Sequence, residues 1–315
     1  GELWAVHGGG FYNPQKYFVG PKQMPSGHLH WFYWESYWTW MSGFALFAVL
    51  YLWNASSFLV DRNVFAWGSP MAAGFAALAF LVVGWLVYDG ICRVFGRNAG
   101  GSESAGPPQA FGTPTGRGNG NAVSWRRRFS GDLRVGVLLA LYVVVATWLA
   151  CQLFSGRAAF LIVGAMLATA MSANVFFWII PGQRKVVADL AAGRKPDPIH
   201  GQRGKQRSVH NTYFTLPVLI AMLSNHYGWL TQAKHNWLVL LALMLGGALI
   251  RHFFVARHKA NVAGQPWPWG YAAAGVVVIV VLAVVMAPAP QTAAAASQPA
   301  SLAQLERGLL DQPPL

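Results

Sequence analysis

Charged residues and cysteines are scarce in this chain of 315 residues. Only 10% of its residues are Asp, Glu, Lys or Arg, against about 25% in an ordinary soluble domain. Two cysteines are too few for a disulfide scaffold, a zinc ribbon or an iron–sulfur cluster held by this chain alone. The Lys and Arg residues are also too sparse for a nucleic-acid-binding face. Instead, 55% of the residues are hydrophobic, with 15 Trp and 19 Phe, which is typical of an integral membrane protein.

Several catalytic signatures are missing as well. The chain has no Gly-x-Gly-x-x-Gly after a strand, no phosphate loop and no His-Glu-x-x-His. It also lacks the Cys-x-x-Cys-His signature of covalent haem. Nucleotide-dependent, zincin and covalent-haem chemistries are therefore unsupported. One glycine-rich run, from His7 to Gly10, permits close approach of the backbone, and its successive N–H groups could cradle an anion.

Seven segments are apolar and long enough to cross a bilayer as helices. A spanning helix needs about 20 apolar residues, and these runs are continuous, whereas barrel strands alternate. Trp and Tyr gather at their ends, as expected at the membrane interfaces. The predicted fold class is therefore all-α, a polytopic transmembrane helix bundle. The predicted spans are Tyr37–Val60, Met71–Tyr88, Leu133–Phe154, Ala158–Ile180, Tyr213–Leu230, Trp237–Phe254 and Gly270–Ala287.

The basic residues predict how the bundle is oriented. Most of the 23 Lys and Arg precede the first span or lie in the connections 89–134, 182–211 and 251–268. Positively charged loops stay in the cytoplasm. We therefore expect the N-terminal segment of this chain in the cytoplasm and its C-terminus on the opposite side, the periplasm of a bacterium.

Composition divides the chain into three parts. Residues 1–34 are predicted to be a cytoplasmic interfacial segment, and residues 35–290 a transmembrane helical domain. Within that domain, the stretch 97–124 is rich in Gly, Ser, Pro and Asn, so we expect a disordered cytoplasmic insertion. Residues 291–315 are interpreted as an extracytoplasmic linker.

Polar groups at membrane depth are costly and mark functional candidates. Most of them here fall on the predicted inner side, whereas His226 belongs to the outer side, about 24 Å along the helix from His210. Lys and Arg at helix ends also snorkel to the interface, so Arg184, Lys185 and Arg207 are equally explained as topology markers. Each histidine alone could be a hydrogen-bonded interfacial residue, but several on one side favour a ligand, metal or haem site. The inner-side candidates are His7, His28, His30, Glu35, Asp89, Gln183, Arg184, Lys185, Arg207, His210, Asn211, Arg251 and His252.

Six stretches carry a family resemblance. They are GELWAVHGGGFY (1–12), HLHWFYWESYWTWMSGFALF (28–47), FSGRAAFLIVGAM (154–166), NVFFWIIPGQRKVV (174–187), KQRSVHNTYFTLPVLIAMLSNHY (205–227) and NWLVLLALMLGGALIRHFFVARH (236–258). In these stretches the chain resembles the membrane portion of the bacterial cytochrome-linked urate oxidases, or urate hydroxylases. The resemblance implies a multi-pass protein of the bacterial inner membrane. It also implies hydroxylation of urate to 5-hydroxyisourate, with water as the oxygen source and a c-type cytochrome as the electron acceptor.

The chain departs from that family pattern in three ways. The resemblance implies eight helices in the full domain, so one helix is expected before this chain. It also implies a C-terminal cytochrome c domain carrying haem c, which the linker 291–315 would lead to, or else a soluble cytochrome c as partner. A histidine is expected at the position of Ile162.

The implied reaction suggests roles for the inner-side residues. Hydroxylation by water requires a base, and we assign Glu35 or His30, with His7 as a further catalytic candidate. Urate is a planar anion, which suits guanidinium and amide donors. We expect Arg184 and Arg251 to bind it and Asn211 and Gln183 to orient it. Electrons would have to cross about 30 Å of hydrocarbon, so we predict a b-type haem in the membrane. The candidate haem ligands are His210 with His252 on the inner side, and His226 for an outer haem.

Two other classes remain open from the sequence. An anion or purine transporter would show an inverted repeat with broken helices, and Pro217 with Gly246 and Gly247 could be such breaks. A cytochrome b-like, quinone-linked membrane subunit could use the same histidines. Uptake of unchanged urate would favour the first, and sensitivity to quinone-site inhibitors the second.

Overall fold

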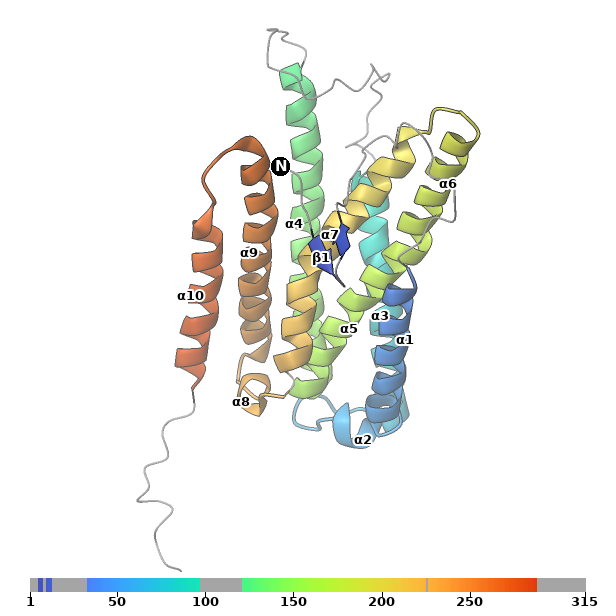
Figure 1. The fold of residues 1–315 in the computed structure, drawn as a ribbon. Helices are drawn as coiled ribbons and strands as arrows, with labels where there is room; N and C mark the ends of the chain where they lie inside the picture. Colours follow the sequence, from blue (N-terminus) through green and yellow to red (C-terminus); the bar gives the residue numbers. More distant parts are fainter. Residues whose placement is uncertain (1–4, 8–9, 13–32, 97–120, 225, 288–315) are drawn as a thin grey trace, which may run out of the picture.

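The computed structural model describes residues 5–7, 10–12, 33–96, 121–224 and 226–287, and these form a bundle of helices (Figure 1). The predicted all-α class is confirmed. The helical elements are α1 (Trp34–Phe47), the π-helical turn η1 (Ala48–Leu52), α2 (Ala55–Phe58), α3 (Pro70–Phe95), α4 (Asn121–Leu153), α5 (Gly156–Asn174), the π-helical turn η3 (Val175–Ile179), α6 (Ile180–Ala191), α7 (Pro198–Ser224), α8 (Gly228–Thr231), α9 (Asn236–Ala263) and α10 (Trp269–Met286).

Two short strands lie near the start of the chain. Strands β1 (Ala5–His7) and β2 (Gly10–Tyr12) pair antiparallel, with His7 opposite Gly10. The rest of the predicted interfacial segment 1–34 lies outside the described residues, apart from Tyr33 and Trp34. His28 and His30 are therefore also outside them, as is the predicted linker 291–315.

Local sequence explains where the long helices begin, end and widen. The Ser69 hydroxyl caps α3 by accepting a hydrogen bond from the backbone N–H of Ala72 at 3.2 Å, and Pro70 follows in the first helical position, where its missing N–H costs nothing. Helix α9 ends at Gly264, whose φ of 63° is left-handed and favours glycine. Pro181 has no N–H to bond the carbonyl of Phe177. The π turn η3 ends at Ile179, two residues before Pro181.

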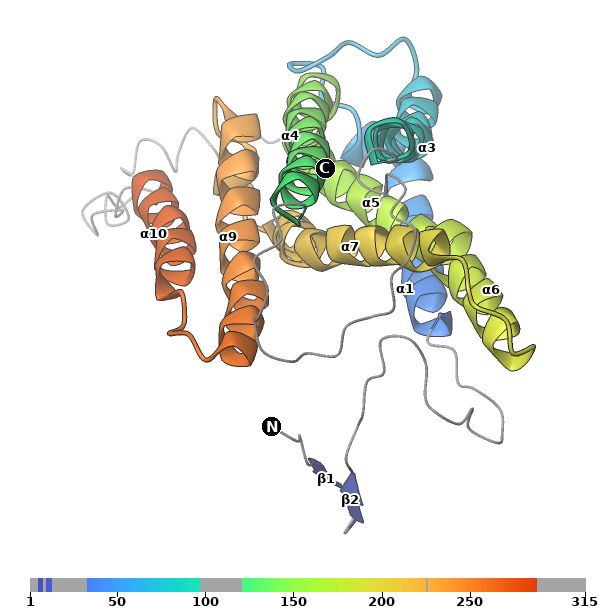
Figure 2. The ribbon, with the colours of Figure 1, turned by 90° about the horizontal axis from the view of Figure 1, so that it is seen from above.

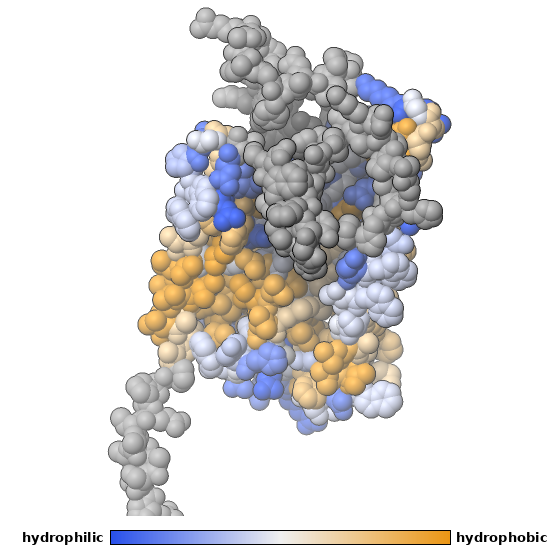
Figure 3. Space-filling model, viewed as in Figure 1, coloured by the Kyte–Doolittle hydropathy of each residue, from blue (hydrophilic) through white to orange (hydrophobic). Residues whose placement is uncertain are grey.

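Among the residues that the structure describes, five helices are long and apolar enough to cross a membrane: Pro70–Phe95, Leu133–Leu153, Gly156–Ala191, Asn236–His258 and Trp269–Met286. They match five of the seven predicted spans and establish the character of a membrane protein. Figure 3 shows apolar side chains gathered over α9 and α10, with hydrophilic residues towards both ends of that surface. The count of seven spans stays a prediction.

The other two predicted spans have different bounds in the structure. The span 37–60 is not one helix, because α1 and η1 end before Asn54, whose Nδ2 donates to the carbonyl of Val49 at 3.3 Å. The span 213–230 is displaced: α7 begins at Pro198 and ends at Ser224. Hydropathy detects only the apolar half of α7, since its first half is rich in basic and amide residues. Helix α4 begins at Asn121, so 121–124, expected to be disordered, are helical, whereas 97–120 lie outside the described residues.

The basic connections share one end of the bundle. The C-terminal end of α3, the link from α6 to α7 and the link from α9 to α10 all lie at the top of Figure 1, whereas α2 and α8 lie at the bottom. The partition of the chain into two sides, predicted from Lys and Arg, agrees with this arrangement. Which end faces the cytoplasm stays a prediction.

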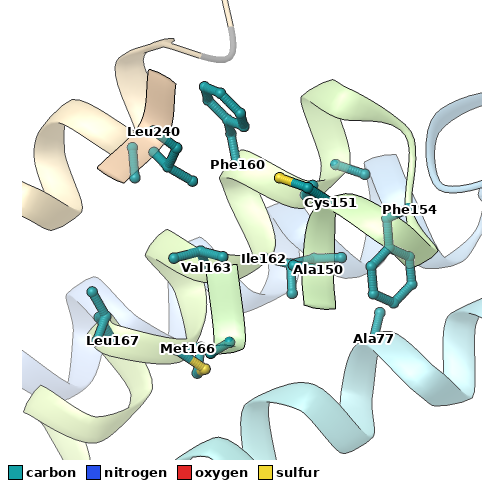
Figure 4. Packing of buried hydrophobic residues seen from close by; sticks show 14 of the residues in the cluster. Ala77, Ala150, Cys151, Phe154, Phe160, Ile162, Val163, Met166, Leu167 and Leu240 are labelled. Atoms are coloured by element: carbon teal, nitrogen blue, oxygen red, sulfur yellow. The ribbon is translucent and has the colours of Figure 1, made fainter. Parts of the chain in front are cut away.

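Helix α5 forms the centre of the apolar core. It packs on α3, α4 and α7, and its buried side chains meet those of neighbouring helices in Figure 4. Ile162, where the resemblance implied a histidine, is completely buried in this cluster, an environment suited to an aliphatic side chain. Cys92 and Cys151 are both buried and free.

Helix α10 lies at one edge of the bundle and packs on α9 (Figure 2). Their backbones come close because a Cβ added to Gly275 would lie 2.7 Å from the carbonyl oxygen of Gly246. Small residues permit such close approach between membrane helices. The opposite face of α10 exposes valines, including Val277 and Val281.

One glycine at the start of α5 is expected to be irreplaceable. A Cβ at Gly156 would collide with the backbone carbonyl of Thr231 in α8. Because backbone must shift to relieve it, Gly156→Ala should lower the free energy of unfolding by about 1–3 kcal/mol. Gly136 in α4 has open space around its Cβ position, so Gly136→Ala is the matched control and should be neutral or slightly stabilising. Thermal unfolding in nanodiscs measures both, and equal stabilities would contradict the prediction.

Candidate functional site

A buried ion pair joins α3 to α7 near the basic end of the bundle. The carboxylate of Asp89 accepts a hydrogen bond from Arg207 Nη2 at 2.6 Å, and the two side chains are only 6% and 3% exposed. Asp89 also accepts from Trp178 Nε1 of η3 at 2.8 Å and from Arg93 Nε one turn further along α3. An ion pair removed from water is tolerated only when further hydrogen bonds satisfy its charged atoms. Asp89 meets this condition with three donors.

Aromatic rings enclose the buried guanidinium. Arg207 Cζ lies 5.1 Å from the ring centre of Tyr88 and 5.0 Å from that of Trp178. Arg93 and Arg203 also lie over Trp178, at 4.8 and 5.8 Å. Cation–π contacts of this kind are strongest where water is excluded. The cluster therefore carries more positive than negative charge, with Asp89 as the carboxylate at its centre.

Two asparagine side chains continue the network. Asn211 Nδ2 donates to the backbone carbonyl of Met171 at 3.0 Å, and Asn211 Oδ1 accepts from Asn174 Nδ2 at 2.9 Å. Asn174 is completely buried. Its Nδ2 also donates to the hydroxyl of Tyr88 at 2.8 Å, and its Oδ1 accepts from Arg207 Nη1 at 3.4 Å. Helices α3, α5 and α7 are thereby tied together by side-chain amides.

The network reaches His210 through Tyr88. Tyr88 Oη lies 2.9 Å from His210 Nδ1, and Cys92 Sγ lies 3.7 Å from the same nitrogen. The rings of Tyr88 and Phe214 flank the imidazole. These residues are called the Asp89–Arg207 network below; its members are Tyr88, Asp89, Asn174, Trp178, Arg207, His210 and Asn211.

A second polar group lies between α7, α9 and α10. Tyr213 Oη is 2.7 Å from His252 Nδ1, and the ring of Tyr271 meets His252 edge-on at 4.4 Å. Arg251 Nε donates to the carbonyl of Thr212 at 3.0 Å. Pro217 has no N–H, so the carbonyl four residues before it, that of Tyr213, has no helical donor. The carbonyl of Thr212, which Arg251 contacts, is the one directly before it. Arg251, expected to bind the anion, thus uses part of its guanidinium to hold α7.

A third group lies along α1. Helix α1 packs on α5 through Trp40 Nε1, which donates to Thr169 Oγ1 at 3.0 Å. Arg184 of α6 lies over the ring of Tyr33 at 5.8 Å, two residues before Glu35. Glu35, Gln183 and Arg184 are all exposed. The structure therefore places the predicted base and one predicted anion donor in the same region.

The remaining predicted site residues are spread out. His226 is exposed and lies just before α8 in the chain, and α8 is at the bottom of the bundle in Figure 1. His7 belongs to β1, and His30 lies outside the described residues. Of the residues to which the sequence assigned a role, His210 and Asn211 lie in the Asp89–Arg207 network. The others lie outside it or outside the described residues.

His210 and His252 differ in how well they would suit haem. A ligating imidazole binds metal through one nitrogen and donates the other N–H to an acceptor. His252 fits, because its Nδ1–H can donate to Tyr213 Oη. His210 fits less well, because the Tyr88 hydroxyl beside its Nδ1 already accepts from Asn174 and, by donating its own proton to Nδ1, would leave the imidazole proton on Nε2. In the part of the chain that the structure describes, no three His, Cys, Asp or Glu side chains are grouped to hold a metal ion.

Sequence reasoning gave no role to several members of the network. Asp89 and Arg207 stood among the inner-side ionisable residues, but nothing in the sequence pairs residues so far apart. Tyr88, Asn174 and Trp178 were missed. The available signal was a polar side chain inside an apolar run: Asn174 interrupts the stretch from Ala173 to Ile180.

The fold and the network define a polytopic membrane protein with a charged, amide-rich site enclosed by helices. A family model described as urate oxidase N-terminal matches residues 1–104 and 123–287, and the chain belongs to that family. Comparison with curated proteins and comparison with solved structures each returned no match.

Proposed function

We propose that this protein is the membrane part of a urate-hydroxylating oxidoreductase. The proposal is carried by the family match over 1–104 and 123–287. In the proposed reaction, water supplies the oxygen that bonds to C5 of urate. Two electrons leave the purine for two molecules of oxidised cytochrome c, two protons are released, and 5-hydroxyisourate forms. The protein is proposed to lie in the inner membrane with the substrate side in the cytoplasm.

The described residues support binding of a planar anion at the basic end. Arg93 and Arg203 add positive charge beside Trp178, and guanidinium groups suit planar oxyanions. Arg184 lies close to the α1 region that carries Glu35. In this proposal the guanidinium groups attract urate, and Glu35 accepts a proton from the attacking water.

The central experiment measures urate loss together with electron transfer. The chain in nanodiscs is mixed with urate and oxidised soluble cytochrome c without oxygen. We expect urate to disappear only when the cytochrome is present, with two cytochromes reduced for each urate. Oxygen from labelled water should appear in the product. Urate that survives with the cytochrome still oxidised would refute the proposal.

A second preparation, in closed vesicles, distinguishes the enzyme from a transporter. When the chain is reconstituted in closed vesicles, a transporter would accumulate chemically unchanged urate inside them. The proposed enzyme predicts no such accumulation without an acceptor. Inhibition of cytochrome reduction by quinone-site inhibitors would instead favour a quinone-linked subunit.

A further inference from the structure

The hydrogen bonds around Asn174 run in one direction. The carbonyl of Met171 can only accept, so it fixes Asn211 with Nδ2 towards Met171 and Oδ1 towards Asn174. Asn174 must then present its Nδ2 to Asn211. Arg207 can only donate, and it faces Asn174 Oδ1. The Met171 carbonyl at one end and the Arg207 guanidinium at the other therefore require the same orientation of the Asn174 amide.

This orientation determines what Tyr88 can do. The second hydrogen of Asn174 Nδ2 is donated to Tyr88 Oη at 2.8 Å. The hydroxyl's own proton is then available for donation to His210 Nδ1, which lies 2.9 Å from Tyr88 Oη. Cys92 Sγ, 3.7 Å from the same nitrogen, can add a weak donor. When Nδ1 accepts this hydrogen bond, the neutral imidazole carries its proton on Nε2.

The other ring nitrogen of His210 has no role within the network. Among the residues that the structure describes, Nε2 has no hydrogen-bond partner, whereas Nδ1 has two neighbours. A cationic imidazole is disfavoured here, because the buried guanidinium of Arg207 lies one helical turn away on α7 and the carboxylate of Asp89 is already bonded to that guanidinium.

We propose that Asn174 and Tyr88 are positioning residues that hold His210 as the neutral Nε2–H tautomer. His210 then offers a hydrogen-bond donor, with no lone pair at Nε2, to the ligand of the site. Where that ligand is urate, which rests on the proposed function, the donor is directed to a carbonyl oxygen of the purine. His210 is accordingly neither a base nor a haem ligand through Nε2.

The test observes the tautomer directly. Full-length chain with ¹⁵N-labelled histidine rings is placed in nanodiscs, and the His210 signals are assigned by their loss in His210→Gln. Ring ¹⁵N shifts distinguish a protonated from an unprotonated nitrogen. We expect protonated Nε2 and unprotonated Nδ1. A protonated Nδ1 in the unmodified chain overturns the proposal.

Asn174→Asp gives the sharpest variant. The new carboxylate can only accept, so the Tyr88 hydroxyl would donate to it and leave Nδ1 facing a lone pair. We expect the His210 proton to move to Nδ1. Tyr88→Phe removes the donor and should give a mixture of both tautomers. If either variant keeps the tautomer of the unmodified chain, the proposal fails.

Tyr142→Phe is the matched control. Tyr142 lies in the same bundle but donates to the carbonyl of Gly84 at 2.9 Å, so its loss should leave the His210 signals unchanged. Kinetics test the positioning role within the proposed urate reaction. Asn174→Asp should raise the KM for urate more than it lowers kcat. If the unmodified chain does not turn over urate, the proposed function fails, while the tautomer shifts still decide the present inference.

Discussion

Arg207→Met is expected to destabilise the protein by about 3 kcal/mol, because it leaves the buried Asp89 carboxylate without its main counter-charge. The two side chains are almost fully buried, so water cannot replace the lost guanidinium. Trp178 and Arg93 still donate to Asp89, which keeps the cost towards the lower end of the range for broken buried pairs. Denaturant titration in nanodiscs, followed by tryptophan fluorescence, measures the change.

Two further variants isolate the cause. Arg93→Met removes the partner of Asp89 whose side chain is 59% exposed, and exposed ion pairs contribute about 0–1 kcal/mol. Adding Asp89→Leu to Arg207→Met removes the uncompensated charge and should recover much of the lost stability. If Arg207→Met and Arg93→Met are equally stable, the buried Asp89–Arg207 pair does not contribute more to stability than the exposed Asp89–Arg93 pair.

Glu35→Gln is expected to reduce kcat for urate at least about 100-fold, the usual minimum contribution of a general base. The amide keeps the size of the side chain but cannot accept the proton from water. Glu35 is exposed in the first turn of α1, where a carboxylate also interacts favourably with the helix dipole. That alternative role predicts a stability loss of only a few tenths of a kcal/mol and unchanged turnover.

Asp61→Asn provides the comparison for Glu35. Asp61 lies at the opposite end of the bundle, where its Oδ1 accepts from the backbone N–H of Asn63 at 2.9 Å. The Asp61→Asn variant should retain normal turnover of urate with cytochrome c. Normal turnover in Glu35→Gln would remove Glu35 from the mechanism.

The continuity and length of the apolar runs predicted most of the helices, because a bilayer demands long hydrophobic runs. They could not predict the start of α7, since its polar first half, from Pro198 to Thr212, is helical through contacts with α6 and η3. Nor could hydropathy reveal the break near Asn54, which depends on a local side-chain bond.

The candidate site was only partly predictable for a related reason. Residue type identifies Asp89, Arg207 and His210 as costly at membrane depth, but their pairing depends on how α3 and α7 cross. Asn174 and Tyr88 carry no charge and look like ordinary residues of a span. Their importance follows from bond direction, which exists only once three helices are assembled.

The π turn η3 joins α5 to α6. The number of residues in this turn therefore sets the direction in which the side chains of α6 point. Each residue advances a helix by about 100°, and a π turn accommodates one residue more than an α turn. Deleting a single residue from Val175–Ile179 would swing the azimuth of α6 by about that angle. Gly182, whose Cβ position lies 3.3 Å from the carbonyl of His200, would turn away from α7, and Arg184 would leave Tyr33. Altering the length of the chain at this turn would therefore redirect an entire helix, whereas exchanging the exposed Phe176 would alter one surface contact.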